Sequence, residues 1–204
     1  MDLIGIEAVA AHGMTEFMEF LLNRCPEKVQ ITEPVVVAAA GNTYWDGQML
    51  VFLFTRWGQE VKITEKVVKQ AAKSGIDRLK LLLDRRDWAV EITEDIVIVA
   101  IEHRTDACLL LELLFARRGS EITITERIAK AAVCHEDYYA SDLAEMFFLH
   151  QGSEWVTEGV VEACIENIQY STTTLEMLLT KTKVKVTRRM MQLGGENEHR
   201  VDTL

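Results

Sequence analysis

The sequence predicts an all-α fold, an α-solenoid of about six stacked antiparallel helix–turn–helix repeats. Three observations carry this prediction: a tripeptide recurs at near-equal intervals, apolar residues follow each copy at helical spacing, and a small residue comes next at a constant distance. A chain of 204 residues that is 49% hydrophobic can bury the core that such an array needs. We expect one solenoid domain over residues 1–192 and a disordered polar tail over residues 193–204.

The repeated tripeptide is Ile-Thr-Glu or a close variant of it. The six copies begin at Ile31, Ile63, Ile92, Ile124, Val156 and Val186. Consecutive threonines lie 29 to 32 residues apart, and the last copy has arginine in place of the acid. These intervals are too regular for chance, so they predict a structural repeat.

Each tripeptide is expected to start the first helix of a repeat. The threonine suits the N-cap because its hydroxyl can accept a hydrogen bond from an N–H of the first turn. The acid sits where the helix dipole favours negative charge, and Pro34 falls in a first turn, where its missing N–H does no harm. Two apolar residues and a small one follow at helical spacing, as in Val67, Val68 and Ala71, and form the buried face.

A second helix is expected in each repeat, centred on an apolar segment such as Phe52-Leu53-Phe54. Gly58, Gly119 and Gly152 follow such segments, and glycine commonly ends helices. A short connector such as Val61-Lys62-Ile63 then leads to the next tripeptide, and its apolar residues should plug the edge of the core.

The unit resembles an ankyrin repeat. Ala71-Ala72-Lys73-Ser74-Gly75 followed by Leu79-Lys80-Leu81-Leu82-Leu83 is similar to the ankyrin run of two alanines, glycine and a leucine triplet, although no unit has the ankyrin Thr-Pro-Leu-His. The Ile-Thr-Glu units are more similar to the degenerate ankyrin-like repeats of fungal NACHT-type (STAND) receptor proteins, where they resemble a C-terminal sensor array. The resemblance covers residues 6–192 and implies an architecture, because no ATPase module is present in this sequence.

Charge and cysteine usage exclude several classes of function. The net charge of −10 disfavours binding to nucleic acid or to anionic membranes by bulk charge. No apolar run approaches the roughly 20 residues of a membrane span, and residues 1–11 lack the features of a secretory signal. No CxxC pair occurs, so we expect free thiols in a cytoplasmic, reducing compartment. The cysteines are Cys25, Cys108, Cys134 and Cys164.

Two charged columns run through the repeats. Both should lie on one side of the array, because each second helix ends where the next first helix begins. The acidic column is the glutamate of the tripeptides, from Glu33 to Glu158. The basic column ends the second helices and consists of Arg24, Arg56, Arg85, Arg117, His150 and Lys181. The two columns are expected to pair between repeats and offset the helix dipoles, and the alternative is an anion-binding ladder.

The turn between the two helices differs in type and length from unit to unit. Tyr, Trp and Arg are typical interface anchors, and loops carry variable function on a fixed scaffold. The alternative is that these rings cover small satellite cores. The candidate partner-binding residues are Tyr44, Trp45, Arg104, Asp106, Tyr138, Tyr139 and Tyr170.

One further set could form a metal site or a polar pocket. His103 and His135 share a repeat position and could approach across neighbouring units, with Glu102 or Glu136 beside them. The alternative is that both are polar residues at helix ends. Cys134 does not pair with His135 as a nucleophile, because adjacent helical residues do not face one another. No phosphate-binding loop or hydrolase motif occurs, and no cofactor is implied.

Solenoids mostly recognise proteins on an extended surface. The sequence therefore predicts a scaffold without catalytic activity that binds a protein partner through its turns and concave face. Two alternatives stay open: a small-molecule binder or enzyme with a pocket in the concave groove, and a sensor-repeat stretch of a larger receptor. The oligomeric state is left open.

Overall fold

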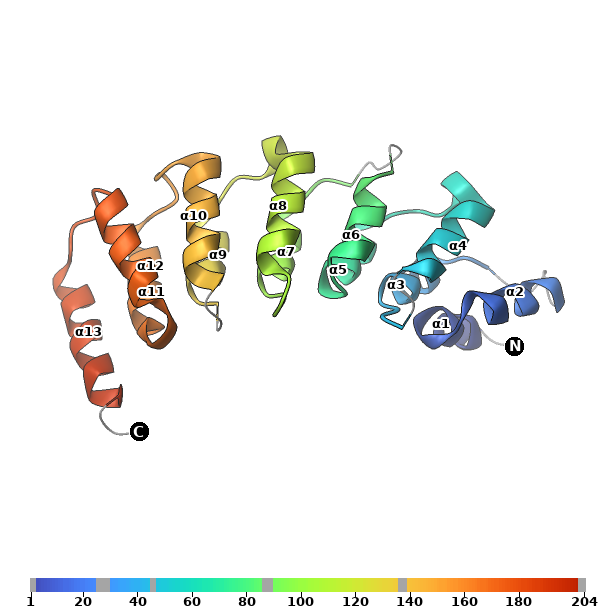
Figure 1. Ribbon diagram of the computed structural model, residues 1–204, viewed down its shortest axis with the longest axis horizontal. Helices are drawn as coiled ribbons and strands as arrows, with labels where there is room; N and C mark the ends of the chain where they lie inside the picture. The colour runs from blue at the N-terminus through green and yellow to red at the C-terminus, as the bar shows by residue number, and fades with distance from the viewer. Residues whose placement is uncertain (1–2, 25–29, 45–46, 86–89, 136–138, 202–204) are drawn as a thin grey trace. The chain divides into compact units, whose positions relative to one another are not determined.

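The computed structural model describes residues 3–24, 30–44, 47–85, 90–135 and 139–201. Within these ranges every regular element is a helix and strands are absent, so the predicted all-α class is confirmed. Consecutive helices pair as hairpins, and neighbouring hairpins pack against one another, as in a helical repeat solenoid (Figure 1). The chain divides into two compact units, Met1–Asp106 and Ala107–Leu204, which are described in turn.

Unit 1 stacks two rows of helices. The first helices of its repeats are α1 (Leu3–His12), α3 (Glu33–Ala40), α5 (Glu65–Lys73) and α7 (Glu94–Ile101). The second helices are α2 (Thr15–Arg24), α4 (Gln48–Trp57) and α6 (Ile76–Leu83), and the 3₁₀ turn η2 (Gly58–Glu60) follows α4. First helices pack against first helices and second helices against second helices, in chain order.

Unit 2 repeats the arrangement. Its second helices are α8 (Ala107–Arg118), α10 (Tyr139–Gln151) and α12 (Ile168–Lys181), with the 3₁₀ turn η3 (Gly119–Glu121) after α8. Its first helices are α9 (Glu126–Val133), α11 (Glu158–Glu166) and α13 (Arg188–Val201). The rows run α8, α10, α12 and α9, α11, α13.

The predicted apolar columns form the core of both units. Val67, Val68 and Ala71 of α5 are fully buried, and the equivalent residues of α3, α7, α9 and α11 are at most 1% exposed. The central residue of the second helices is equally buried, as at Leu53 and Phe147. Full burial of one such large side chain stabilises the fold by about 1.5–3 kcal/mol.

Most connectors close the edge of the core as predicted, although Ile63 is half-buried and Val186 is exposed. The buried apolar residues of the connectors are Val61, Ile92, Ile122, Ile124 and Val156. Trp155, next to the last of these, is buried as well, and its ring lies edge-on to Phe147 at 5.5 Å.

Threonine stands in extended conformation before α3, α5, α7, α9 and α11, which confirms its position as N-cap. The hydroxyls of Thr125 and Thr157 each accept a hydrogen bond at 3.3 Å from the backbone N–H three residues later. At Thr32 the hydroxyl oxygen is buried and makes no hydrogen bond.

Threonine hydroxyls also join consecutive repeats. Three of them donate to the glutamate of the preceding tripeptide: Thr64 to Glu33 at 2.7 Å, Thr93 to Glu65 at 2.9 Å, and Thr157 to Glu126 at 2.8 Å. The sequence predicted that the acidic column pairs with the basic column. At these three acids the next repeat instead supplies its threonine, and at Glu33 also Lys66 at 3.1 Å, because these side chains start from adjacent first-helix ends.

The helix α13 follows the sixth tripeptide copy. The hydroxyl of Thr187 accepts a hydrogen bond from the N–H of Met190 at 3.2 Å, and Gly194 takes the small position seven residues after the threonine. The helix runs on to Val201, and the domain boundary expected at residue 192 stays a prediction. The helix-start pattern of the repeat simply continues past residue 192.

None of the described helices combines the length and the apolar character that crossing a membrane would require.

Candidate binding surface at the inter-helix turns

A polar residue stands ten positions after the threonine of five repeats, where the first helix gives way to the turn. The residues of this column are Asn42, Ser74, His103, His135 and Asn167. Only its two histidines were singled out from the sequence. The constant spacing was a signal for the whole column, but the changing residue type hid it.

The turn between α3 and α4 is held by the buried Asn42. Its side-chain amide donates to the carbonyls of Ala10 and Gly13 in the preceding repeat, at 3.0 and 3.2 Å. Its side-chain oxygen accepts a hydrogen bond from the backbone N–H of Tyr44 at 3.1 Å. The anchored turn therefore presents Tyr44, whose side chain is 70% exposed and meets only the edge of His12 among described rings.

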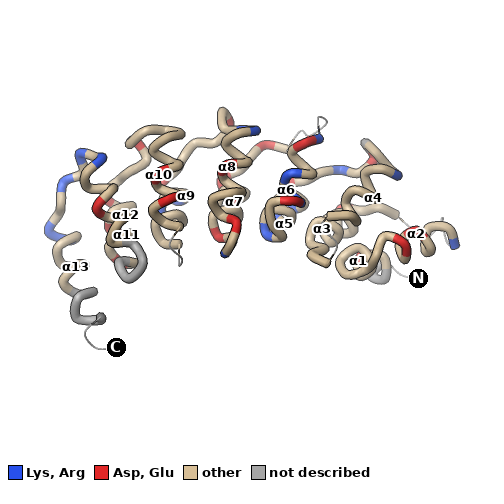
Figure 2. The backbone as a smooth tube through the Cα atoms, in the orientation of Figure 1, with Lys and Arg blue, Asp and Glu red and all other residues tan. Residues whose placement is uncertain are grey.

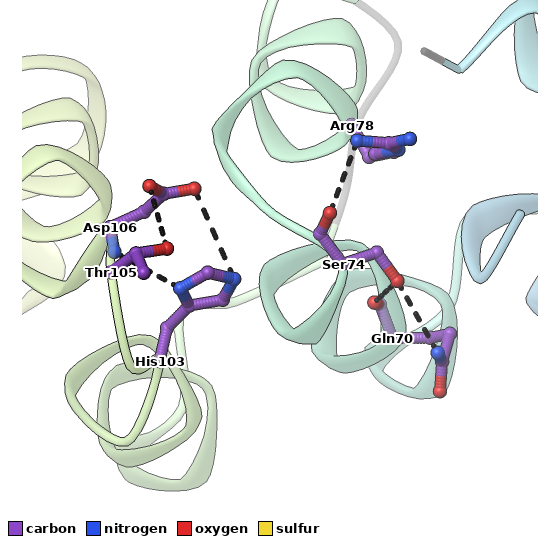
Figure 3. Close-up of polar contacts among 6 residues, drawn as sticks. All are labelled: Gln70, Ser74, Arg78, His103, Thr105 and Asp106. Atoms are coloured by element: carbon purple, nitrogen blue, oxygen red, sulfur yellow. Dashed lines mark hydrogen bonds and ion pairs between the residues drawn. The ribbon is translucent and has the colours of Figure 1, made fainter. Parts of the chain in front are cut away.

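The next turn, between α5 and α6, is built around Ser74, Gly75 and Arg78 (Figure 3). The hydroxyl of Ser74 donates to the carbonyl of Gln70 at 2.9 Å, and the guanidinium of Arg78 donates to the carbonyl of Ser74 at 3.1 Å. Arg78 is only 6% exposed and also donates to the carbonyl of Asn42 at 3.2 Å. It thereby ties two consecutive turns together.

The turn after α7 is held by His103 and Asp106 (Figure 3). His103 Nδ1 accepts a hydrogen bond from the backbone N–H of Asp106 at 3.1 Å, and the Asp106 carboxylate lies 3.9 Å from His103 Nε2. The hydroxyl of Thr105 donates to the same carboxylate at 3.2 Å. A Cβ built on Gly75 would lie 3.2 Å from that carboxylate, so the two turns pack closely.

These three turns form what we call the turn edge of unit 1, residues 41–44, 74–78 and 102–106. Hydrogen bonds between repeats hold the first two turns, and the third turn packs closely on the second, so we expect the edge to be fixed before any partner binds. A groove of about 320 Å³ opens beside it and carries charges of both signs together with an imidazole. Its lining residues are Lys73, Val99, Glu102, His103 and Arg104.

The remaining candidate anchors are placed as follows. Arg104 is exposed on the turn edge, and Asp106 is half-buried within it. Tyr139 begins α10 in unit 2 and is half-buried, with its ring 5.8 Å from the buried His135. Trp45 and Tyr138 lie outside the described residues, as does the side chain of Tyr170 in α12.

Three members of the basic column contact the preceding repeat, whereas Arg56 lies 5.8 Å from the ring centre of Trp57 in its own helix. Arg85 lies 4.3 Å from the ring centre of Phe54 and donates to the carbonyl of Gly58 at 3.2 Å. His150 stacks on Phe115 at 4.2 Å and bonds the carbonyl of Ile122 at 3.1 Å.

Lys181, the last member of the basic column, lies 5.1 Å from the ring of Phe148. Arg24, Arg56 and Arg117 are exposed. Cation–aromatic contacts of this kind contribute about 0.5–1 kcal/mol each at exposed sites. These contacts give the column a part in joining repeats, and its role as an anion-binding ladder stays a prediction.

The members of the candidate metal set belong to different units of the chain. Glu102 and His103 belong to unit 1, His135 belongs to unit 2, and Glu136 lies outside the described residues. Within the described part of the chain, no three His, Cys, Asp or Glu side chains come close enough together to hold a metal ion.

Two described thiols, those of Cys108 and Cys134, are poor nucleophiles. No disulfide joins the described cysteines. Burial, aided by the carboxylates of Asp142 and Glu112, raises the pKa of Cys108 to about 11. Burial and then Glu166 also raise the pKa of Cys134, so at neutral pH both thiols are protonated and weakly reactive.

Comparison with known protein families matches four segments of the chain to one family model, described as Domain of unknown function (DUF7104). The matched segments are residues 20–49, 52–75, 81–104 and 113–137, which together make up just over half of the chain. The chain belongs to this family.

Each DUF7104 segment from residue 52 onward runs from the middle of a second helix, through the connector, to the end of the next first helix. The family unit therefore contains the threonine, the glutamate and the buried columns, which join the repeats. Residues 76–80 and 105–112, on the far side of the turns, lie between the matched segments. The comparisons with curated proteins and with solved structures found no match to this DUF7104 chain.

Proposed function

We propose that this chain is a protein-recognition scaffold whose partner docks on the turn edge of unit 1. The observation that carries the proposal is the combination of a rigid backbone with an exposed anchor. Asn42 is buried and bonded on both sides, yet the Tyr44 that it positions is 70% exposed. A large aromatic side chain on a fixed turn loses little conformational entropy when a partner covers it.

Charge on the turn edge adds specificity to this anchor. Lys73, Glu102 and Arg104 are exposed around the groove beside His103. Charges of both signs favour a protein partner of complementary pattern over a polyanion, in keeping with a net charge of −10. The repeats behind the edge have a structural role, because the threonines and glutamates of their tripeptides bind one another.

The experiment is quantitative capture of partners from the source cells with three forms of the chain: wild type, the double variant Tyr44→Ala/Arg104→Ala, and the control Leu149→Ser. Leu149 is an exposed apolar residue of α10 in unit 2. We expect one partner to be lost with the double variant and retained by the control, while all three forms melt at similar temperatures. Equal recovery of every partner by all three forms would contradict the proposal, and so would a clearly lower Tm for Tyr44→Ala.

A small-molecule site is the second candidate function, favoured by the groove of about 320 Å³ in which Glu102 and His103 meet Lys73. That volume lies at the lower limit of ligand sites, and four of the five lining residues are polar or charged. A ligand that raises Tm for the wild type and not for His103→Ala/Glu102→Gln would support this candidate. Loss of partner capture by Tyr44→Ala alone would count against it.

We further infer that the array is related to the ankyrin-like Ile-Thr-Glu repeats of fungal NACHT/STAND receptors and works in the cytoplasm as a sensor segment. The recurring tripeptide supports the relation, and the lack of a disulfide among the described cysteines supports a reducing compartment. Sequencing of the native transcript tests the first point: an ATPase module in the same reading frame is expected. Fractionation of source cells tests the second, and recovery outside the cytosol would contradict it.

A further inference from the structure

The exposed face of α2 is apolar and aromatic. Met14, Phe17 and Phe20 are about half exposed, and the rings of Phe17 and Phe20 stack in parallel with centres 6.4 Å apart. The other side of α2 is already in the core, where Met18, Leu21 and Leu22 are buried. The exposed rings are therefore surplus to the packing of unit 1.

The repeat register shows what this face corresponds to. Phe20 occupies the position of Phe52 in α4 and of Leu81 in α6, one residue before the buried central leucine. Both of these are half-buried, and Leu81 points at the preceding repeat, where a Cβ built on Gly47 would lie 2.6 Å from its Cδ1. The side chain at this position of a second helix therefore faces the preceding repeat. At Phe20 it is 56% exposed.

A matching apolar groove lies beside α13. The row of second helices in unit 2 ends with α12, whereas the row of first helices extends to α13, and no described helix follows. A groove of about 170 Å³ results, in which Val186 and Met191 are exposed. It is lined by Val161, Ile165, Leu175, Leu179, Val186, Met190, Met191 and Gly194. It lies where the second helix of a repeat would pack against α13.

Charge distinguishes the two surfaces. Residues 1–23 contain four Asp or Glu and no Lys or Arg, whereas residues 181–192 contain five Lys or Arg and no Asp or Glu. Figure 2 shows the acidic residues of α2 and the cluster of basic residues on the connector between α12 and α13. Glu16 and Glu19 are exposed beside the two rings, and Lys183 and Lys185 are exposed beside the groove. In a chain of net charge −10, a basic segment next to an apolar groove is a local exception.

We propose that the α2 face of one copy packs into the groove beside the α13 of a second copy, in the place that a second helix takes within each unit. The rings of Phe17 and Phe20 cover Val186 and Met191, and Glu16 and Glu19 face the lysines of the connector. The contact continues the packing of second helix on second helix that already builds each unit. Because the two surfaces differ, it is heterologous, so copies add head to tail.

The test is sedimentation of the full chain over a range from micromolar to millimolar, at low and high salt. The wild type should associate with rising concentration and dissociate as salt screens the charges. Phe17→Ser/Phe20→Ser removes one surface and Val186→Asp/Met191→Asp the other, and each variant alone should stay monomeric. Leu109→Ser is the matched control, since Leu109 in α8 is as exposed as Phe17. It should associate like the wild type.

Mixing the two blocked variants decides the geometry. Each retains the surface that the other has lost, so a heterologous contact predicts a one-to-one heterodimer that grows no further. A wild type that is monomeric throughout overturns the proposal. A mixture that stays monomeric, although the wild type associates, overturns it too, because the contact is then between identical surfaces. Tyr44→Ala should leave association unchanged, which separates this test from that of the proposed function.

Discussion

The threonine of each tripeptide serves two repeats at once. Thr157 accepts a hydrogen bond from the N–H of Val160 in its own helix and donates one to Glu126 in the repeat before it. The hydroxyl has one donor and two acceptor sites, so both bonds can coexist. The dipeptide Thr-Glu is therefore both a helix cap and a joint between repeats, which explains why it recurs where the turns do not.

Thr157→Val tests this double role, with Thr32→Val as the matched control. Loss of both bonds at position 157 should lower the free energy of unfolding by about 1–2 kcal/mol. The hydroxyl of Thr32 is buried without a hydrogen bond, so valine there should be neutral or stabilising. Chemical denaturation of both variants provides the measurement. Equal destabilisation would mean that the hydroxyl contacts are unimportant.

The glutamates of the acidic column should make the stability of the fold depend on pH. The pKa of Glu33 is lowered by the Thr64 hydroxyl and then by Lys66, and the pKa of Glu126 by Lys130 and then by Thr157. Glu65 behaves alike through Lys69 and Thr93. A carboxylate with a lowered folded-state pKa stabilises the fold above its ordinary value of 4.5, and this contribution is lost as the pH falls through the lower folded value.

The melting temperature of the wild type should therefore fall as the pH drops below about 4.5. The triple variant Glu33→Gln/Glu65→Gln/Glu126→Gln should show a flatter profile over the same range, because it no longer has these protons to bind. The difference should shrink in high salt, since the groups are partly exposed. Parallel profiles for the two proteins at low salt would contradict the prediction.

At the residue scale, the sequence predicted where a side chain lies in its helix better than which residue it contacts. The threonine was expected as a cap from its place before an apolar run, and it is one. Its bond to a glutamate about 30 residues earlier could not be predicted, because that bond depends on how adjacent helix ends align. Likewise the basic column was visible in the sequence, but the rings beneath Arg85 and His150 follow from the packing between repeats.

At the scale of elements, the turns depend on backbone geometry as much as on side chains. Gly75 has φ of +108°, and a Cβ there would meet the carboxylate of Asp106. Gly75→Ala should therefore lower the free energy of unfolding by about 1–3 kcal/mol, because both the conformation and the close approach oppose a side chain.

Gly195→Ala is the control for this glycine. Gly195 lies in α13, and a Cβ there would meet nothing within 4 Å. Alanine should stabilise this helix by about 0.5–1 kcal/mol. Circular dichroism melts of both variants measure the two effects, and a gain in stability for Gly75→Ala would show that the turn relaxes easily.

The helices themselves were predictable because apolar periodicity and caps coincide in each repeat. The turn edge was predicted only in part: Tyr44, Arg104 and Asp106 were singled out by residue type. The bonds from Asn42 to Ala10 and from Arg78 to Asn42 run between repeats, and sequence spacing alone does not reveal such contacts.

At the scale of the whole molecule, repeats that touch only their neighbours should transmit damage over a short range. Leu53 in unit 1 and Phe147 in unit 2 are fully buried centres of their second helices. Leu53→Ala should cost about 2–5 kcal/mol and Phe147→Ala about 3–5 kcal/mol, through lost burial and the cavity left behind. The question is where in the chain these losses appear.

Hydrogen exchange followed along the chain answers it. Leu53→Ala should speed exchange in α3, α4 and α6 and leave α9, α11 and α12 close to wild type, and Phe147→Ala should do the reverse. Local opening of this kind is expected where cooperative units coincide with neighbouring repeats, and here the chain divides into two compact units. If either variant instead accelerates exchange equally in both units, the array unfolds as one body. A partner bound at the turn edge would then stabilise all repeats alike, instead of unit 1 first.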